Sequence, residues 1–126
     1  MDKKIYYHDT DAGGVVYYAN YLKYLEEART EYLESRGENV PKFIEQGFFF
    51  AVRSCNVIYK SPARYGETIS ADANVKKVTG TQIFFHQRIL NKATEQVMVE
   101  AEVSLVCLTL DFKPRAIPDG LREKLA

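Results

Sequence analysis

The hydrophobic period of this chain changes once, and the change constrains the fold more than any other feature of the sequence. Between Tyr18 and Arg36, apolar residues recur at the spacing of helical turns, with charged residues between them. The apolar stripe holds Tyr21, Leu25, Ala28 and Tyr32, and is widened by Leu22, Tyr24 and Leu33. After Gly47 apolar and polar residues alternate, which is the period of β-strands. The sequence therefore predicts one long helix followed by strands.

Five strands are predicted, one before the helix and four after it. They cover Ile5–His8, Phe48–Lys60, Thr68–Val78, Gln82–Leu90 and Gln96–Leu110. Gly37 is placed to cap the end of the long helix. Asn39–Gln46 and Pro118–Ala126 have the patterns of short additional helices.

This order of elements indicates an α+β domain with two layers. Strands that follow one another through short turns usually pair as antiparallel neighbours, so we expect an antiparallel five-stranded sheet packed on the helix. A single helix cannot cover both faces of such a sheet. We therefore expect the chain to pair with a second copy of itself.

Length and charge exclude several classes of protein. The 126 residues fit a single domain, residues 1–126. The 17 basic and 17 acidic side chains cancel, which gives no global field for nucleic acid. No apolar run is long enough to span a membrane, and we expect no signal peptide. Cys55 and Cys107 stand alone, so we expect two buried free thiols in the cytoplasm and no metal site.

The segment Tyr7–Tyr21 carries the strongest indication of chemistry, because Asp11 stands in a glycine-rich loop just ahead of the long helix. Glycines let backbone N–H groups approach a ligand, and a helix start offers unpaired donors that stabilise an oxyanion. A carboxylate beside them can attack a carbonyl or take a proton from water. The other interpretation is that Asp9 and Asp11 only cap a turn and the helix start.

The run from Tyr7 to Tyr32, which contains DTDAGGVVYYANYLKYLEEARTEYL, also resembles the 4-hydroxybenzoyl-CoA thioesterase-like family. It is most similar to the YbgC-like acyl-CoA thioesterases of the bacterial Tol-Pal operon. The resemblance extends over essentially the whole chain, including the Ser61-Pro62-Ala63 step. It implies a hotdog fold, in which an antiparallel sheet wraps around one helix. It also implies dimers joined edge to edge, and often tetramers.

Carried over residue by residue, the resemblance makes Asp11 the catalytic carboxylate, acting as nucleophile or as general base. The backbone N–H near Tyr18 would polarise the thioester carbonyl, and Tyr7 would lie beside the site. Many members of this branch have histidine where this chain has Tyr18, so an imidazole base is missing here unless His8 replaces it. The implied substrate contacts include Gly13, Gly14 and Val15, while Asn20 either caps the helix or faces the site.

The resemblance implies a substrate that carries coenzyme A, so no separate cofactor is expected. Lys60 and Arg64 flank Ser61-Pro62-Ala63 and are candidates for contacts to its phosphates, although they are equally natural as solvated charges. The turn Val78–Thr81 lacks the arginines that the hydroxybenzoyl type carries after its third strand.

Three hypotheses about function remain open. The first is hydrolysis of short-to-medium or aromatic acyl-CoA. The second is the same reaction on acyl groups presented by acyl carrier protein. The third is a non-catalytic module that binds acyl groups or partners in envelope maintenance, which the intact Asp11 and the Gly13-Gly14 loop disfavour.

Overall fold

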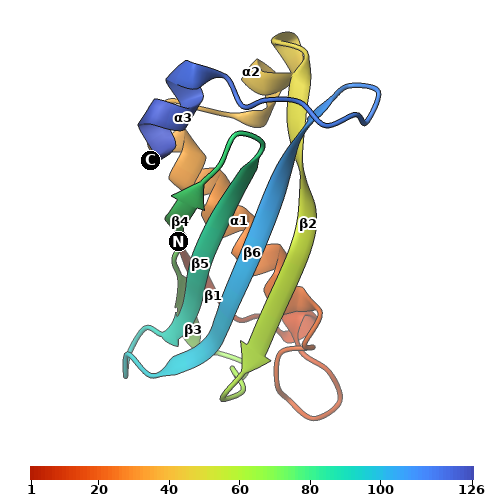
Figure 1. Cartoon of the computed structure of the whole chain (residues 1–126). Helices are drawn as coiled ribbons and strands as arrows, with labels where there is room; N and C mark the ends of the chain where they lie inside the picture. The colour runs from red at the N-terminus through yellow and green to blue at the C-terminus, as the bar shows by residue number, and fades with distance from the viewer.

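The computed structural model describes residues 1–126 as an antiparallel sheet with the helix α1 (Asn20–Glu34) lying across one face (Figure 1). The strands are β1 (Asp2–Lys4), β2 (Phe48–Tyr59), β3 (Thr68–Ala71), β4 (Asn74–Val78), β5 (Gln82–Asn91) and β6 (Val97–Thr109). The smaller elements are a 3-10 turn η1 (Tyr7–Asp9) and the helices α2 (Val40–Glu45) and α3 (Asp119–Leu125). The predicted α+β class and the sheet around one long helix are confirmed.

The helix α1 buries the stripe that its sequence period predicts. Its buried residues are Tyr21, Tyr24, Leu25, Ala28, Arg29 and Leu33. The helix begins and ends two residues inside the predicted range, Tyr18–Arg36. Gly37 has a φ of 76°, the left-handed conformation that ends helices, and the Glu38 N–H returns to the Leu33 carbonyl at 3.0 Å. The predicted glycine cap is therefore confirmed.

The strand order β1-β3-β5-β6-β2 places β2 at one edge of the sheet, where its only neighbour is β6. Pairing of consecutive strands was predicted throughout and holds for β5 with β6, but it is wrong for β2 with β3. The segment that joins β2 to β3 instead crosses alongside the N-terminal loop. Main-chain hydrogen bonds hold the crossing segment there, from Val16 N–H to the Ala63 carbonyl and from Ile5 N–H to the Glu67 carbonyl, each at 2.8 Å.

The predicted single strand Thr68–Val78 is wrong, because the segment forms two strands, β3 and β4, that both pair with β5. Asp72 lies at the break. Its carboxylate accepts a hydrogen bond from the Arg88 N–H at 2.7 Å and forms an ion pair with the Arg88 guanidinium at 3.2 Å. The sheet therefore has six strands instead of the predicted five.

The predicted strand Ile5–His8 is also wrong. The first strand, β1, lies earlier in the chain, and η1 occupies the end of the predicted range. The cause is Asp9, whose carboxylate accepts a hydrogen bond from the Tyr6 N–H at 2.9 Å and so closes a turn. Such local side-chain bonds compete with strand formation.

The core is one cluster of 24 buried apolar residues between α1 and the sheet. Cys107 belongs to it, as predicted, but Cys55 is exposed on the edge strand β2, so the expectation of two buried thiols is wrong for Cys55. No helix is long and apolar enough to cross a membrane. The N-terminal loop that carries Asp11 lies at the same end of the sheet as the C-terminal end of β2 (Figure 1).

Candidate active site

Asp11 stands in a tight loop whose shape depends on glycine. Its Oδ1 accepts a hydrogen bond from the Gly13 N–H at 2.9 Å, and its carbonyl accepts one from the Gly14 N–H at 3.0 Å. Gly14 has a φ of 76°, which side chains rarely tolerate, and a Cβ on Gly13 would stand 3.2 Å from Oδ1. The Asp11 carboxylate is exposed and takes part in no ion pair within 4.0 Å, so it is available to a ligand.

Asp9 has the opposite environment and anchors the loop to the core. It is buried, and its carboxylate accepts hydrogen bonds from the Tyr6 N–H and from the Tyr24 hydroxyl, the latter at 2.8 Å. Lys3 lies 3.4 Å away. Burial by itself raises the pKa of Asp9, but the two hydrogen bonds and the Lys3 charge together outweigh it and hold that pKa below its usual range. The prediction that Asp9 is a turn residue is consistent with these contacts.

A hollow of about 320 Å³ opens beside Asp11, between the N-terminal loop, the start of α1 and the end of β2. Its lining consists of Asp11, Val15, Val16, Tyr18, Tyr21, Tyr59, Lys60, Ser61 and Pro62. The N–H groups of Tyr18 and Ala19 donate to no acceptor within the chain. The hollow thus places an available carboxylate near the free amides at the start of a helix, where partial positive charge accumulates.

The other polar groups of the hollow are neutral or already paired. Burial raises the pKa of Tyr21 and of Tyr59, so both phenols keep their protons at neutral pH. The Tyr21 hydroxyl accepts a hydrogen bond from the Ala63 N–H at 3.0 Å. The Lys60 ammonium pairs with Glu100 at 3.1 Å. Asp11 is the only carboxylate in the lining, and hence the only anionic group there that can act as base or nucleophile.

The structure gathers four of the predicted site residues in this hollow, namely Asp11, Val15, Tyr18 and Lys60. The others lie around it. Tyr7 is 81% exposed, and its ring packs on Tyr65 outside the lining. The Asn20 amide donates to the Asp9 carbonyl at 3.0 Å, a packing contact rather than a contact to the hollow.

Gly13 and Gly14 shape the loop without lining the hollow. Arg64 lies beyond it, where its backbone pairs with Val15 and its N–H donates to the Glu67 carboxylate. Its side chain is not among the groups that line the hollow.

Sequence reasoning missed Tyr59, which completes the aromatic wall of the hollow. Tyr59 packs against Tyr18 at 6.1 Å and against Tyr21 at 5.7 Å between ring centroids. Its strand position gave no indication of this role, because the contact depends on the strand β2 ending beside the start of α1. No three His, Cys, Asp or Glu side chains lie close enough together to hold a metal ion.

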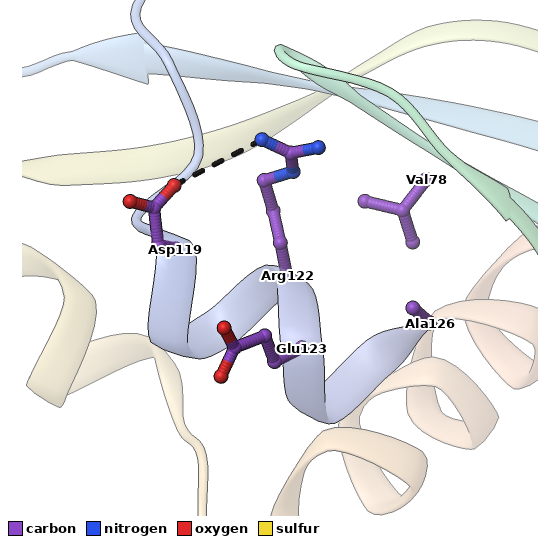
Figure 2. A pocket seen from close by; sticks show the side chains of 5 residues that line it. All are labelled: Val78, Asp119, Arg122, Glu123 and Ala126. Atoms are coloured by element: carbon purple, nitrogen blue, oxygen red, sulfur yellow. Dashed lines mark ion pairs between the residues drawn. The ribbon is translucent and has the colours of Figure 1, made fainter.

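A second hollow, of about 290 Å³, lies beside α3 (Figure 2). Val78, Asp119, Arg122, Glu123 and Ala126 line it, and its charged pair, Asp119 with Arg122, is 3.9 Å apart and exposed. Its carboxylate at a helix start, that of Asp119, is paired with Arg122, whereas the Asp11 carboxylate takes part in no ion pair. The hollow at Asp11 is therefore the better candidate for chemistry.

An antiparallel sheet wrapped around one long helix, with the candidate site at the start of that helix, defines a hotdog domain. Residues 6–125 match the thioesterase-like superfamily. The acyl-CoA thioester hydrolase YbgC of Escherichia coli O6:H1 is 40% identical over 119 residues, which cover 94% of this chain and 88% of that protein. The acyl-CoA thioesterase YbgC of Helicobacter pylori strain J99 is 37% identical, over an alignment that covers 100% of this chain and 98% of that protein.

A solved structure of a probable thioesterase from Bartonella henselae superimposes with a TM-score of 0.86 at 30% identity, covering 94% of this chain and 97% of that one. The chain belongs to the thioesterase-like superfamily, in which it resembles the YbgC proteins, and is a thioester hydrolase by class. The predicted hotdog fold and family are confirmed.

Proposed function

We propose that this protein hydrolyses short-to-medium or aromatic acyl-CoA thioesters to a free acid and coenzyme A, with Asp11 as the catalytic carboxylate. One observation carries the proposal: the available Asp11 carboxylate and Tyr18, whose N–H has no acceptor in the chain, line the same hollow. The two YbgC relatives are named for acyl-CoA thioesters, which favours coenzyme A as the group that leaves.

In this proposal the thioester carbonyl oxygen accepts a hydrogen bond from the Tyr18 N–H. Negative charge develops on that oxygen as the carbonyl carbon becomes tetrahedral, and a fixed donor at a helix start stabilises it. The neutral phenols of Tyr21 and Tyr59 form the wall beside it. Neither phenol competes with Asp11 for the proton of an attacking water.

Two routes lead from this arrangement to products. As general base, Asp11 takes a proton from water while the water oxygen bonds to the carbonyl carbon; the C–S bond then breaks and the thiolate leaves. As nucleophile, an Asp11 oxygen bonds to the carbon and expels the thiolate, and water hydrolyses the resulting anhydride. The exposed loop has room for water on either route. Neither route needs a cofactor beyond the coenzyme A of the substrate.

The remaining predicted residues take supporting roles in the proposal. Gly13, Gly14 and Val15 hold the loop open to substrate, and Asn20 fixes the loop to α1 through the Asp9 carbonyl. Lys60 lies at the hollow, where it can exchange Glu100 for a phosphate of coenzyme A. Arg64 and Tyr7 lie further out, where the nucleotide part would extend.

The proposal includes a second copy of the chain, in a homodimer or a tetramer. The outer edge of β2 has no neighbour in the sheet, and Val52 and Ile58 on this strand are each 54% exposed. Unpaired strand edges are templates for pairing. We also place the reaction in the cytoplasm, which suits two cysteines that form no disulfide.

The test is release of free thiol from a panel of acyl-CoAs, short to long and one aromatic, alongside the same acyl groups on acyl carrier protein. Turnover that is faster on the coenzyme A thioesters supports the proposal and ranks the acyl groups. Turnover confined to the carrier-protein thioesters would show that the leaving group is the carrier protein and not coenzyme A. Turnover on neither series would contradict hydrolysis by this protein.

A further inference from the structure

The inference concerns Tyr24, a buried residue of α1 that does not line the hollow at Asp11. Its hydroxyl donates a hydrogen bond to the Asp9 Oδ1 at 2.8 Å. Burial and, after it, this bond to the Asp9 carboxylate raise the pKa of Tyr24, so the phenol keeps its proton and remains the donor. The central helix thus holds Asp9 through a charge-assisted hydrogen bond, which is stronger than one between neutral groups.

Asp9 in turn closes the base of the loop that carries Asp11. The Asp9 carbonyl accepts hydrogen bonds from the Tyr17 N–H and from the Asn20 side-chain amide, each at 3.0 Å. Asp9 precedes Asp11 by two residues, and its partner Tyr17 directly precedes Tyr18. A displacement of Asp9 would therefore move the Asp11 carboxylate and the free Tyr18 N–H relative to each other.

Tyr24 provides the only hydrogen bond that joins the Asp9 carboxylate to α1. The other groups around this carboxylate come from the N-terminal segment and lie near Oδ2: the Tyr6 N–H at 2.9 Å, the Lys3 ammonium at 3.4 Å and the His8 ring at 3.7 Å. Loss of the Tyr24 hydroxyl would leave Oδ1 without a donor, which is costly for a buried, ionised oxygen. We therefore expect Asp9 to shift when this hydroxyl is removed, and the loop to shift with it.

We propose that Tyr24 is a positioning residue for thioester hydrolysis: acting through Asp9, its hydroxyl holds the Asp11 carboxylate and the Tyr18 N–H at the separation that the reaction needs. This role rests on the proposed function of the hollow, and Tyr24 itself touches no substrate. Groups misplaced by about 1 Å can slow an enzyme by about a hundredfold. An error of position acts on the transition state, so it lowers kcat and leaves KM nearly unchanged.

The first test compares Tyr24→Phe with Tyr32→Phe on the acyl-CoA that the wild type hydrolyses fastest. Tyr32 is the matched control, because it also lies on α1, is partly buried, and forms hydrogen bonds through its carbonyl and not through its hydroxyl. We expect Tyr24→Phe to lower kcat at least about tenfold, with KM within about threefold of wild type. Tyr32→Phe should keep both constants. A Tyr24→Phe variant whose kcat stays within about twofold of wild type, or whose loss lies in KM alone, would overturn the proposal.

Asp9→Ala and its double variant with Tyr24→Phe show whether Tyr24 acts through Asp9. Once the carboxylate is removed the hydroxyl has no partner, so the double variant should have about the same kcat as Asp9→Ala. Losses that multiply in the double variant would overturn action through Asp9. Should Asp9→Ala fail to fold, the amide signal of Tyr17 decides the same question, because its N–H bonds to the Asp9 carbonyl.

Amide NMR signals test the positioning without substrate. Tyr24→Phe should shift the signals of the Tyr17 and Tyr18 N–H groups, whereas Tyr32→Phe should leave both in place. Unchanged signals in Tyr24→Phe would overturn the proposal even if kcat fell. Failure of the proposed function is a separate result: a wild type that hydrolyses no thioester contradicts hydrolysis itself, while an active wild type matched by Tyr24→Phe contradicts only the role of Tyr24.

Discussion

Asp9 and Asp11 are separated by one residue and have opposite environments. Asp9 is buried against Tyr24 and Lys3, whereas the Asp11 carboxylate is exposed and accepts a hydrogen bond only from the Gly13 N–H. The first carboxylate has its partners inside the protein, and the second has capacity left for a substrate. At the residue scale, therefore, Asp9 supports the loop and Asp11 is the group available for chemistry.

Replacing Asp9 with Asn should lower stability in a pH-dependent way. The folded pKa of Asp9 is below its usual value, so its carboxylate adds stability above pH about 4 and loses that contribution as the pH falls through the folded pKa. We expect Asp9→Asn to cost about 1–3 kcal/mol of unfolding free energy at neutral pH. Urea denaturation measures this cost, and the difference from wild type should shrink in acid. A cost that is independent of pH would contradict a paired, ionised Asp9.

Among the elements, those set by local residues were predicted well from the sequence. The helix α1, its glycine end and the helix α2 follow from apolar spacing, from Gly37 and from Asn39, which caps α2 by accepting from the Lys42 N–H at 2.9 Å. The errors arose where contacts between residues distant in the sequence determine where a strand begins or ends. Asp72 divides β3 from β4 through its contacts to Arg88 on another strand, and no local pattern encodes that contact.

The residues of the candidate site divide in the same way into local and distant ones. Asp11 and Tyr18 lie within one continuous motif and both line the hollow, whereas Tyr59, Ser61 and Pro62 come from the end of β2 and the segment after it, which the fold brings beside that motif. Arg29 is one of the charged residues between the apolar positions of the predicted helix, and helical spacing alone does not reveal that it is buried over Gln87.

The loop before α1 should depend on Gly14 in particular. With a φ of 76°, Gly14→Ala forces a side chain into the left-handed region and should cost about 1–2 kcal/mol of unfolding free energy. Gly80→Ala is the matched control, because Gly80 has no positive φ and no neighbour within 4 Å of an added Cβ. Denaturation of both variants checks this, and equal midpoints would show that the loop does not need the Gly14 conformation.

For the whole molecule, the free edge of β2 predicts assembly. Two copies paired antiparallel along this strand would continue the sheet and cover exposed Val52 and Ile58. The short strand β1 at the other edge offers far less backbone for pairing.

Val52→Lys should weaken this assembly, because it places a charge among the apolar groups of the pairing surface. Light scattering coupled to size-exclusion chromatography should show an oligomer for the wild type and a shift towards monomer for the variant. Tyr6→Lys, at a residue that is 52% exposed near β1, is the control and should keep the wild-type mass. A monomeric wild type, or equal masses for all three proteins, would contradict pairing along β2.

The most direct test of the central claim compares wild type with Asp11→Asn on the acyl-CoA that the wild type hydrolyses fastest. The Asn side chain can still accept from the Gly13 N–H, so denaturation midpoints should agree while kcat/KM falls at least about a hundredfold. That result would assign the reaction to Asp11. A folded variant whose kcat/KM stays within a few-fold of wild type would contradict the account, because no other carboxylate lines the hollow.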